Sequence, residues 1–388
     1  MNNHTDPWEA EMSREFDQRV RDLHEAPLTF DHVKGKAMKI RRTRRVAAAG
    51  GILAAAAVII PVAVFAGQGL TDNDSGPGPA ETPTPNPTAI DPVAPGFGYL
   101  EGSTLHLADG STVELPQRYD RATVLGDIVL AARNDDETGF DFLDVIDESG
   151  TAIETLEIVS GPVLNDDQTT VAYVERDGDL VTRSEGGDEQ VIASDLGTNV
   201  FPVAVIGCGE GADSCRVYVD DGAEGAAVID ENGDVQVLAP DALGVEDANA
   251  DGLATVQNDS QIDGSCGGIY DENAADYVWE TCDYYLFDLS PDSKHVNATH
   301  PYLDGIGNGY AEILDAATGK PVGARFEPEE GFIGQTVWQD ADHLLFTMYD
   351  AGGWSIYRLA VDGTTERLAG PSDAGDDTTP AYVLLGGS

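Results

Sequence analysis

The chain has 388 residues and a formal net charge of −49, because 70 acidic residues face only 21 lysines and arginines. The charge is uneven: residues 1–45 hold ten basic and eight acidic residues, and the remainder holds 11 and 62. So acidic a remainder repels nucleic acids and anionic lipid headgroups, which excludes both as its partners. A solvated acidic surface explains this charge, and a specific cation-binding role for the charge as a whole is the alternative.

Residues 1–45 predict a short helical tail with a basic end. Asp6 is placed to cap a helix, and Pro7 suits its first turn. Apolar residues then recur at helical spacing as one stripe: Trp8, Met12, Phe16, Val20 and Leu23. Because so short a tail cannot bury this stripe by itself, two interpretations stay open. One is a helix on the membrane surface or without a partner, and the other is a docking helix for a cytoplasmic regulator.

An uncharged run, VAAAGGILAAAAVIIPVAVFA, occupies residues 46–66 and is long enough to cross a bilayer as one helix. Seven basic residues precede it: Lys34, Lys36, Lys39, Arg41, Arg42, Arg44 and Arg45. Basic residues on this side favour a cytoplasmic N-terminus. We therefore expect a single-pass membrane protein whose C-terminal part is extracytoplasmic. A signal peptide cleaved after Ala66 is the alternative, although 45 residues make a long leading segment.

Residues 67–97 predict an extended linker, because proline and polar residues deny this stretch a core. All four cysteines lie further on, where an external location favours disulfides. We predict the local pairs Cys208–Cys215 and Cys266–Cys282. Free or metal-binding thiols are the alternative, but the spacings are not the C-x-x-C of zinc sites.

From residue 98 onward short β-rich runs alternate with glycine, aspartate and asparagine. Two-residue hairpin turns with positive φ at both residues are expected at Asp109-Gly110, Ser149-Gly150, Gly186-Gly187, Asn232-Gly233, Thr318-Gly319 and Asp362-Gly363. Most of these turns lie about 40 residues apart, and the one long gap predicts a further turn near residue 276. Cys266 and Cys282 flank that position. Seven hairpins at this period are typical of four-stranded propeller blades.

Three segments share one layout, a short strand, an acidic turn and a second strand. They are SGPVLNDDQTTVAYV at 160–174, LSPDSKHVNATH at 289–300 and TVWQDADHLLFTMY at 336–349. They resemble the W-S-P-D-G-K-x-L-A-F repeats of TolB and WD40-like β-propellers. Leu289 to Lys294 match well, and the Gly-His and Trp-Asp dipeptides of true WD40 repeats are absent. The resemblance implies an all-β, seven-bladed propeller over residues 98–388.

The first blade of such a propeller begins at its second strand, near Tyr99. The apolar run from Ala381 to Leu385 is suited to a buried strand. We expect it to supply the missing innermost strand of the first blade, which would close the ring and remove two exposed sheet edges.

One loop has a sequence motif that predicts Ca²⁺ as a ligand. Asp247, Asn249 and Asp251, followed by Gly252, read D-x-N-x-D-G, and oxygens at alternate positions are suited to Ca²⁺. The loop resembles the calcium loops of EF-hand proteins and of integrin-type propellers. It departs from the EF-hand pattern because Asn258 stands at the twelfth position in place of glutamate. An ordinary turn rich in Asp and Asn is the alternative, and no other cofactor is predicted.

Enzyme signatures are scarce. The H-E-x-x-H, G-x-S-x-G and Walker patterns are absent, which predicts a protein that is not an enzyme. Aromatic residues late in the chain are candidates for a binding face or, as the alternative, for blade core. They are Tyr302, Tyr310, Trp338, Tyr349, Trp354 and Tyr357.

Together these features predict a membrane-anchored extracytoplasmic propeller that acts as a ligand- or protein-binding scaffold or sensor. The layout of tail, span and external domain also resembles actinobacterial anti-sigma-factor-like membrane proteins. That resemblance implies that residues 1–45 bind a cytoplasmic partner. It does not extend to the zinc pattern H-x-x-x-C-x-x-C, because residues 1–207 contain no cysteine. A propeller hydrolase is the third interpretation.

Overall fold

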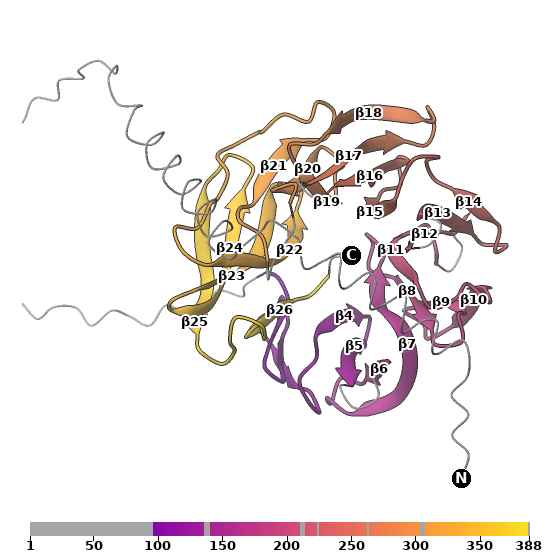
Figure 1. Cartoon of the computed structure of the whole chain (residues 1–388). Coiled ribbons are helices and arrows are strands. Elements are labelled where there is room, and N and C mark those ends of the chain that lie inside the picture. The colour runs from indigo at the N-terminus through magenta and orange to yellow at the C-terminus, as the bar shows by residue number, and fades with distance from the viewer. Residues whose placement is uncertain are drawn as a thin grey trace, which may run out of the picture. The chain divides into compact units, whose positions relative to one another are not determined.

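The computed structural model describes residues 96–135, 140–209, 214–222, 225–261, 264–302 and 307–386 (Figure 1). Every regular element in these ranges is a β-strand, which confirms the all-β prediction for this part. No helix within these ranges is long and apolar enough to cross a membrane. The predicted tail, the span at 46–66 and nearly all of the linker lie outside the described residues and stay predictions.

The strands form antiparallel sheets. The first has the order β26 (Tyr382–Leu384), β1 (Tyr99–Glu101), β2 (Thr104–His106) and β3 (Thr112–Glu114). The second runs from β4 to β10 in chain order. Its strands are β4 (Arg121–Leu125), β5 (Ile128–Asp135), β6 (Phe140–Ile146), β7 (Ala152–Leu164), β8 (Thr170–Glu175), β9 (Leu180–Ser184) and β10 (Glu189–Ala193).

Four further sheets follow in chain order. One contains β11 (Val200–Ile206), β12 (Arg216–Asp221), β13 (Gly225–Asp230) and β14 (Val235–Val237). The next contains β15 (Gly244–Ala248), β16 (Leu253–Gln261), β17 (Gly264–Asp271) and β18 (Asp276–Thr281). Then come β19 (Tyr285–Leu289), β20 (His295–Thr299) and β21 (Glu312–Asp315). The last contains β22 (Phe332–Asp340), β23 (His343–Asp350), β24 (Gly353–Ala360) and β25 (Thr365–Ser372).

The sheets stand around a common axis in a propeller-like arrangement (Figure 1). Each innermost strand contacts the next one along the chain, through β4, β7, β11, β15, β19 and β22. Strand β22 then contacts β26, and β26 contacts β4, so that the ring of inner strands is continuous. A continuous ring places the ends of all these strands around one axis.

Strand β7 is long because its two halves pair with different strands. Its first half pairs with β6, from Ala152 to Ile158, and its second half pairs with β8, from Ile158 to Leu164. The register shifts between Ile158 and Val163, as expected of bulges that bend a strand. This bend makes one seven-stranded sheet out of two groups of strands that the sequence pattern separates.

Glycine turns join the outer strands at the predicted positions. Gly110, Gly150, Gly187, Gly233, Gly319 and Gly363 all have positive φ, between 67° and 88°. The residue before each glycine does not, so the predicted two-residue turns with positive φ at both positions are wrong. In the first turn Leu107 N donates to Ser111 O at 2.9 Å, which closes a longer loop with one left-handed glycine. The Asp109 carboxylate also accepts from Ser111 N at 2.8 Å, and this hydrogen bond stabilises the turn.

The predicted turn near residue 276 is also present, because β17 and β18 form a hairpin. The predicted closure is confirmed as well. Tyr382, Val383 and Leu384 pair with β1, with Tyr99 opposite Leu384 and Glu101 opposite Tyr382. All three β26 side chains are buried. The innermost strand of the first sheet therefore comes from the far end of the described chain.

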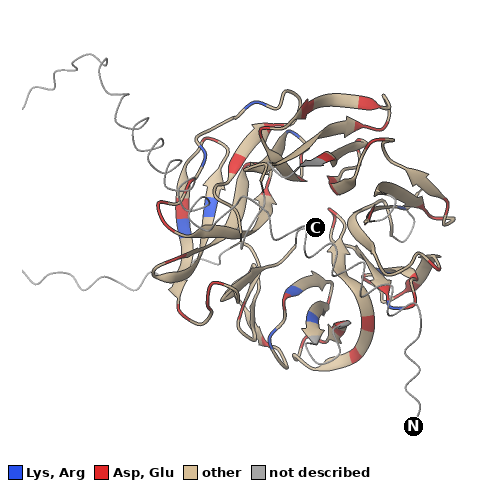
Figure 2. Cartoon of the chain, viewed as in Figure 1, with Lys and Arg blue, Asp and Glu red and all other residues tan. Residues whose placement is uncertain are grey.

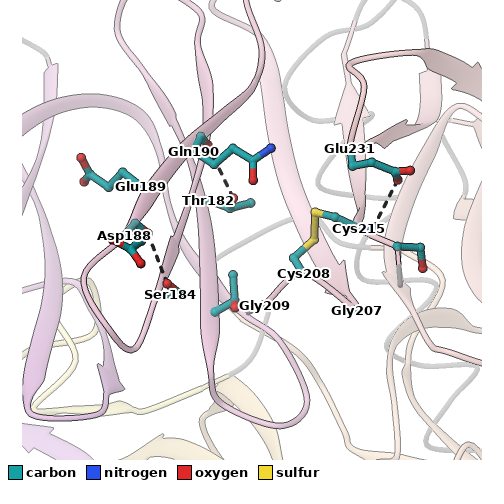
Figure 3. A pocket seen from close by; sticks show the side chains of 12 residues that line it. Thr182, Ser184, Asp188, Glu189, Gln190, Gly207, Cys208, Gly209, Cys215 and Glu231 are labelled. Carbon is teal, nitrogen blue, oxygen red and sulfur yellow. Dashed lines mark hydrogen bonds between the residues drawn. A yellow bond between two sulfur atoms is a disulfide. The ribbon is translucent and has the colours of Figure 1, made fainter. Parts of the chain in front are cut away.

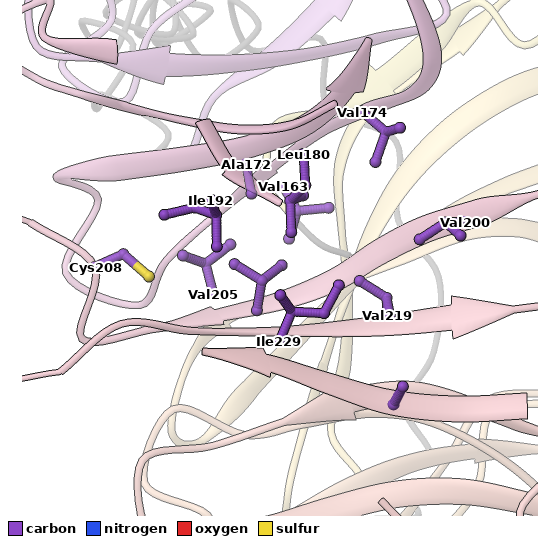
Figure 4. Packing of buried hydrophobic residues seen from close by; sticks show 12 residues of the cluster. Val163, Ala172, Val174, Leu180, Ile192, Val200, Val205, Cys208, Val219 and Ile229 are labelled. Atoms are coloured by element: carbon purple, nitrogen blue, oxygen red, sulfur yellow. The ribbon is translucent and has the colours of Figure 1, made fainter. Parts of the chain in front are cut away.

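Adjacent sheets bury apolar side chains between them. Figure 4 shows the cluster between the β8–β10 region and the sheet of β11–β14. Val174 and Leu180 contribute from one side, and Val219 and Ile229 from the other. Cys208 lies at the margin of this cluster, where the apolar contact ends.

Candidate functional site

Three similar turns end the inner strands β7, β15 and β19. In each a polar side chain at the first turn position accepts from a later backbone amide. Asn165 Oδ1 accepts from Thr170 N at 2.9 Å, Asn249 Oδ1 from Leu253 N at 3.0 Å, and Ser290 Oγ from His295 N at 3.0 Å. These side chains hold the turns, and the turns place the residues beside them at the axis.

An axial cavity of about 220 Å³ lies where these inner strands end. Residues from β7, β11, β15, β19, β22 and the segment after β26 line it. The lining includes Asn165, Asp166, Val205, Asp247, Asp288, Trp338, Gln339 and Leu385. Three carboxylates therefore reach a cavity that contains no lysine or arginine among its described lining residues.

Burial makes the axial carboxylates hard to ionise. Burial raises the pKa of Asp247 well above its usual value, and the nearby charge of Asp288 raises this pKa further. Amide hydrogen bonds from Leu289 (2.7 Å) and Ala248 (2.8 Å) to the Asp247 carboxylate oppose the rise. Burial and the charge of Asp167 likewise raise the pKa of Asp166. A positively charged group in this cavity would relieve the repulsion.

Glu246 is a second, partly buried acid on the same strand as Asp247. Burial raises its pKa to about 7, although the hydrogen bond donated by the Tyr285 hydroxyl lowers it. Glu246 and Asp247 are adjacent on β15 where its register shifts; Glu246 lines a small cavity beside Tyr285, and Asp247 lines the axial cavity. The inner strand therefore carries acids toward the axis and toward the neighbouring sheet.

The loop predicted to bind calcium is the turn between β15 and β16. Asn249 Oδ1 accepts from Asp251 N and Leu253 N, both at 3.0 Å, as the alternative of an ordinary Asx turn predicts. Asp247 directs Oδ2 to Leu289 N, and Asp251 is exposed. Among the described residues, no three His, Cys, Asp or Glu side chains are grouped as a metal site requires. The turn explains the motif structurally, and calcium stays a prediction.

Two larger cavities have volumes of about 710 and 470 Å³, and the larger of them shares the lining residue Asn165 with the axial cavity. The two larger cavities share five lining residues with each other: Ser184, Asp188, Gly207, Cys208 and Gly209. We call the three cavities together the acidic groove. Its two outer cavities are lined by the carboxylates of Asp127, Asp167, Glu185, Asp188, Glu189 and Glu231.

No protein cation offsets most of this charge. Within the described ranges no lysine or arginine lines the acidic groove, and of the six outer carboxylates only Glu189 forms an ion pair, with Arg183 at 3.2 Å. Figure 2 shows how few basic residues the sheets carry in all. Ionised carboxylates without an ion pair along neighbouring cavities attract cations and repel anions.

Both predicted disulfides are confirmed. Cys208 pairs with Cys215, and both residues line the outermost cavity of the groove (Figure 3). Cys266 on β17 pairs with Cys282 just after β18, so that this bond clamps the base of the hairpin. The described residues contain no free cysteine, and the alternative of metal-binding thiols is thereby wrong.

The predicted aromatic residues serve mainly the blade core. Trp354 and Tyr310 are buried, while Tyr302 is exposed. Trp338 alone of the six lines the acidic groove, and its Nε1 donates to Asp288 O at 3.0 Å. The predicted docking stripe of Trp8, Met12, Phe16, Val20 and Leu23 lies outside the described residues.

Sequence reasoning missed Asp166, Asp288 and Thr170, which line the groove in the structure. None of them belongs to a ligand-binding motif. One signal was present: in the repeated segments Asp166 follows Asn165 as Pro291 follows Ser290. Aligning these turns places Asp166 at the axis, where Pro291 also lies.

No protein-family model and no curated protein matches the chain. Among solved structures, TolB from Agrobacterium tumefaciens is 9% identical over 53% of this chain and 78% of that chain, with a TM-score of 0.37. BamB from Moraxella catarrhalis is 15% identical over 70% of this chain and 81% of that one, with a TM-score of 0.41. The Swd1 β-propeller domain from Myceliophteria thermophila is 9% identical over 65% and 87%, with a TM-score of 0.44. Likeness this low assigns no function, and the propeller-like fold rests on the sheet topology.

Proposed function

We propose that this chain is a membrane-anchored, extracytoplasmic, seven-bladed β-propeller that binds a positively charged ligand or protein segment in its acidic groove. It acts as a binding scaffold or sensor and not as a catalyst. The count of seven takes the two halves of the β4–β10 sheet as separate blades that share β7. The anchor and orientation rest on the basic cluster and the apolar run at 46–66.

One observation carries the binding proposal. Three neighbouring cavities, linked in series by shared lining residues, are lined by carboxylates, and no lysine or arginine lines them in the described part of the chain. A fold gains nothing from gathering like charges, since they repel one another. A cationic partner binds more tightly because these charges attract it, and attraction at long range also speeds its association.

Calorimetry with the full-length protein in detergent micelles tests this proposal. A hexalysine peptide should bind at low ionic strength, and a hexaglutamate peptide should not. The double variant D188N/E231Q should weaken hexalysine binding about fivefold, as expected for two exposed charge contacts. Glu329 and Glu330 are exposed and line none of the three cavities. E329Q/E330Q is therefore the control of equal charge, and equal weakening by both double variants would refute a groove-specific site.

A second function is carried by the tail. We propose, as the alternative, that residues 1–45 bind a cytoplasmic regulator through the stripe of Trp8, Met12, Phe16, Val20 and Leu23, in the manner of anti-sigma-factor-like proteins. The observation in its favour is an apolar stripe on a segment too short to bury it. A sigma factor that co-purifies with the full-length chain but not with the W8A/F16A/L23A variant would support this function. Equal recovery of the sigma factor with both chains would contradict this function.

A further inference from the structure

The cavity of about 470 Å³, which shares no lining residue with the axial cavity, is the outermost part of the acidic groove and forms a cleft between two sheets. Thr170, Thr182 and Ser184 come from β8 and β9, while the Cys208–Cys215 disulfide and Glu231 come from the side of β11–β13 (Figure 3). Deeper between the same sheets lies the apolar cluster of Figure 4. The facing surfaces therefore change from aliphatic side chains to hydroxyls where the cleft opens.

Thr170 is the unusual residue of this cleft. It is only 2% exposed, yet its Oγ1 has no hydrogen-bond partner among the described residues. Its backbone is fully engaged, because Thr170 N donates to Asn165 Oδ1 and Thr170 O accepts from Asn165 N, both at 2.9 Å. The hydroxyl faces Gly209, where a Cβ would lie 3.4 Å from Oγ1, and Gly209 also lines the cleft. A buried hydroxyl without a partner is costly, and because Thr170 lines a cleft, its Oγ1 is placed to accept a hydrogen bond from a bound ligand.

The charges around the cleft restrict the ligand. Asp188, Glu189 and Glu231 line it, so that an anion is repelled. None of its described lining residues is aromatic, which leaves a sugar ring without a stacking platform. The described residues also lack the grouped His, Cys, Asp or Glu side chains that a metal ion requires. An organic cation with hydrogen-bond donors fits what remains.

We infer that this cleft is a subsite for one alkylammonium group, such as a lysine side chain of the cationic segment, with Thr170 Oγ1 as an acceptor at its base. The inference rests on the proposed function and names the chemistry of one position within the groove. An ammonium group has three donors on a narrow stem. It can therefore reach a recessed hydroxyl while its remaining donors face the rim carboxylates.

A pair of matched variants tests this subsite. Thr123 is 3% exposed, its Oγ1 has no hydrogen-bond partner in the described part of the chain, and it lines none of the three cavities of the groove. T170V and T123V therefore each delete a buried, unpartnered hydroxyl with little change of shape. Neither should lower the thermal unfolding midpoint of the full-length protein. T170V alone should weaken hexalysine binding, by about tenfold, the range for a hydrogen bond to a charged group.

The conservative variant T170S keeps the hydroxyl and should retain the affinity of the unmodified chain, even if T170V fails to fold. Spermine, titrated in parallel, shows whether the ammonium group must belong to a peptide; weakening by T170V of either ligand supports the subsite. Equal hexalysine and spermine affinities for T170V, T123V and the unmodified chain would overturn it. That result would leave the broader groove standing as long as D188N/E231Q still weakens binding more than E329Q/E330Q.

Discussion

Ring closure through β26 allows a quantitative test at Leu384. This side chain is 1% exposed and packs with Phe97, Val337 and Trp354. Its backbone pairs with Tyr99, and its N–H donates to Gln335 Oε1 at 2.7 Å. The substitution L384A keeps the backbone bonds and removes only the packed side chain. Large-to-small changes at such sites cost about 2–5 kcal/mol, and a fully buried leucine next to a tryptophan should cost about 3 kcal/mol.

Chemical denaturation of the full-length protein measures this cost, and hydrogen exchange locates it. A loss of about 3 kcal/mol confined to closure should speed exchange in β1 and β26 by roughly two orders of magnitude. Leu143 is the matched control, because it is equally buried but lies on β6, inside a sheet. L143A should lower global stability by a similar amount without selective exchange at β1. A loss below about 0.5 kcal/mol for L384A, or equal exchange in both variants, would refute closure as the point of weakness.

Three further predictions follow from buried acids, disulfides and topology. Because the folded pKa of Glu246, about 7, exceeds the unfolded value of 4.5, its contribution to stability is greatest below pH 4.5 and is lost as pH rises to about 7. Its full size is at most about 3 kcal/mol. E246Q should therefore change the dependence of unfolding free energy on pH mainly between these values, and parallel curves for both chains would contradict this assignment. The C266S/C282S variant should unfold about 2–4 kcal/mol more easily, and denaturation measures that loss; an unchanged free energy would show that the clamp adds no stability. Protease added to intact cells should release a fragment that begins within the linker at 67–97, whereas a secreted protein starting at Gly67 would contradict the anchor.

Local signals in the sequence predicted the parts of the fold that depend on few residues. Gly110 and Gly233 mark turns because a left-handed conformation is cheap only for glycine. Cys266 and Cys282 were predictable as a pair because a hairpin turn lies midway between them. The strand from Tyr382 to Leu384 was predictable because an apolar run without a local partner needs a distant one.

The candidate site was less predictable because it depends on which turns meet in space. Asp166 and Asp288 are ordinary acids in a chain with 70 of them, and only the ring brings them to one axis. The D-x-N-x-D-G motif drew attention to Asp247, and the structure shows that Asn249 has the turn role of Asn165, as the alternative of an ordinary Asx turn predicted. The Thr170 hydroxyl has no partner among the described residues because of how the strands around it pack, and no sequence pattern encodes that packing.

The pairing of β26 with β1 requires each molecule to bring distant parts of its chain together before the ring closes. Arg118 donates to the Pro380 carbonyl, 262 positions along the chain, so this contact forms between segments that meet late. Until they meet, β1 presents an open edge that the β26 of a second molecule fits equally well. Whether a molecule closes on itself or exchanges strands with a neighbour is then a competition between internal effective concentration and protein concentration. The membrane anchor proposed at residues 46–66 would hold such molecules in one plane, where exchange of this strand would link them into pairs or chains.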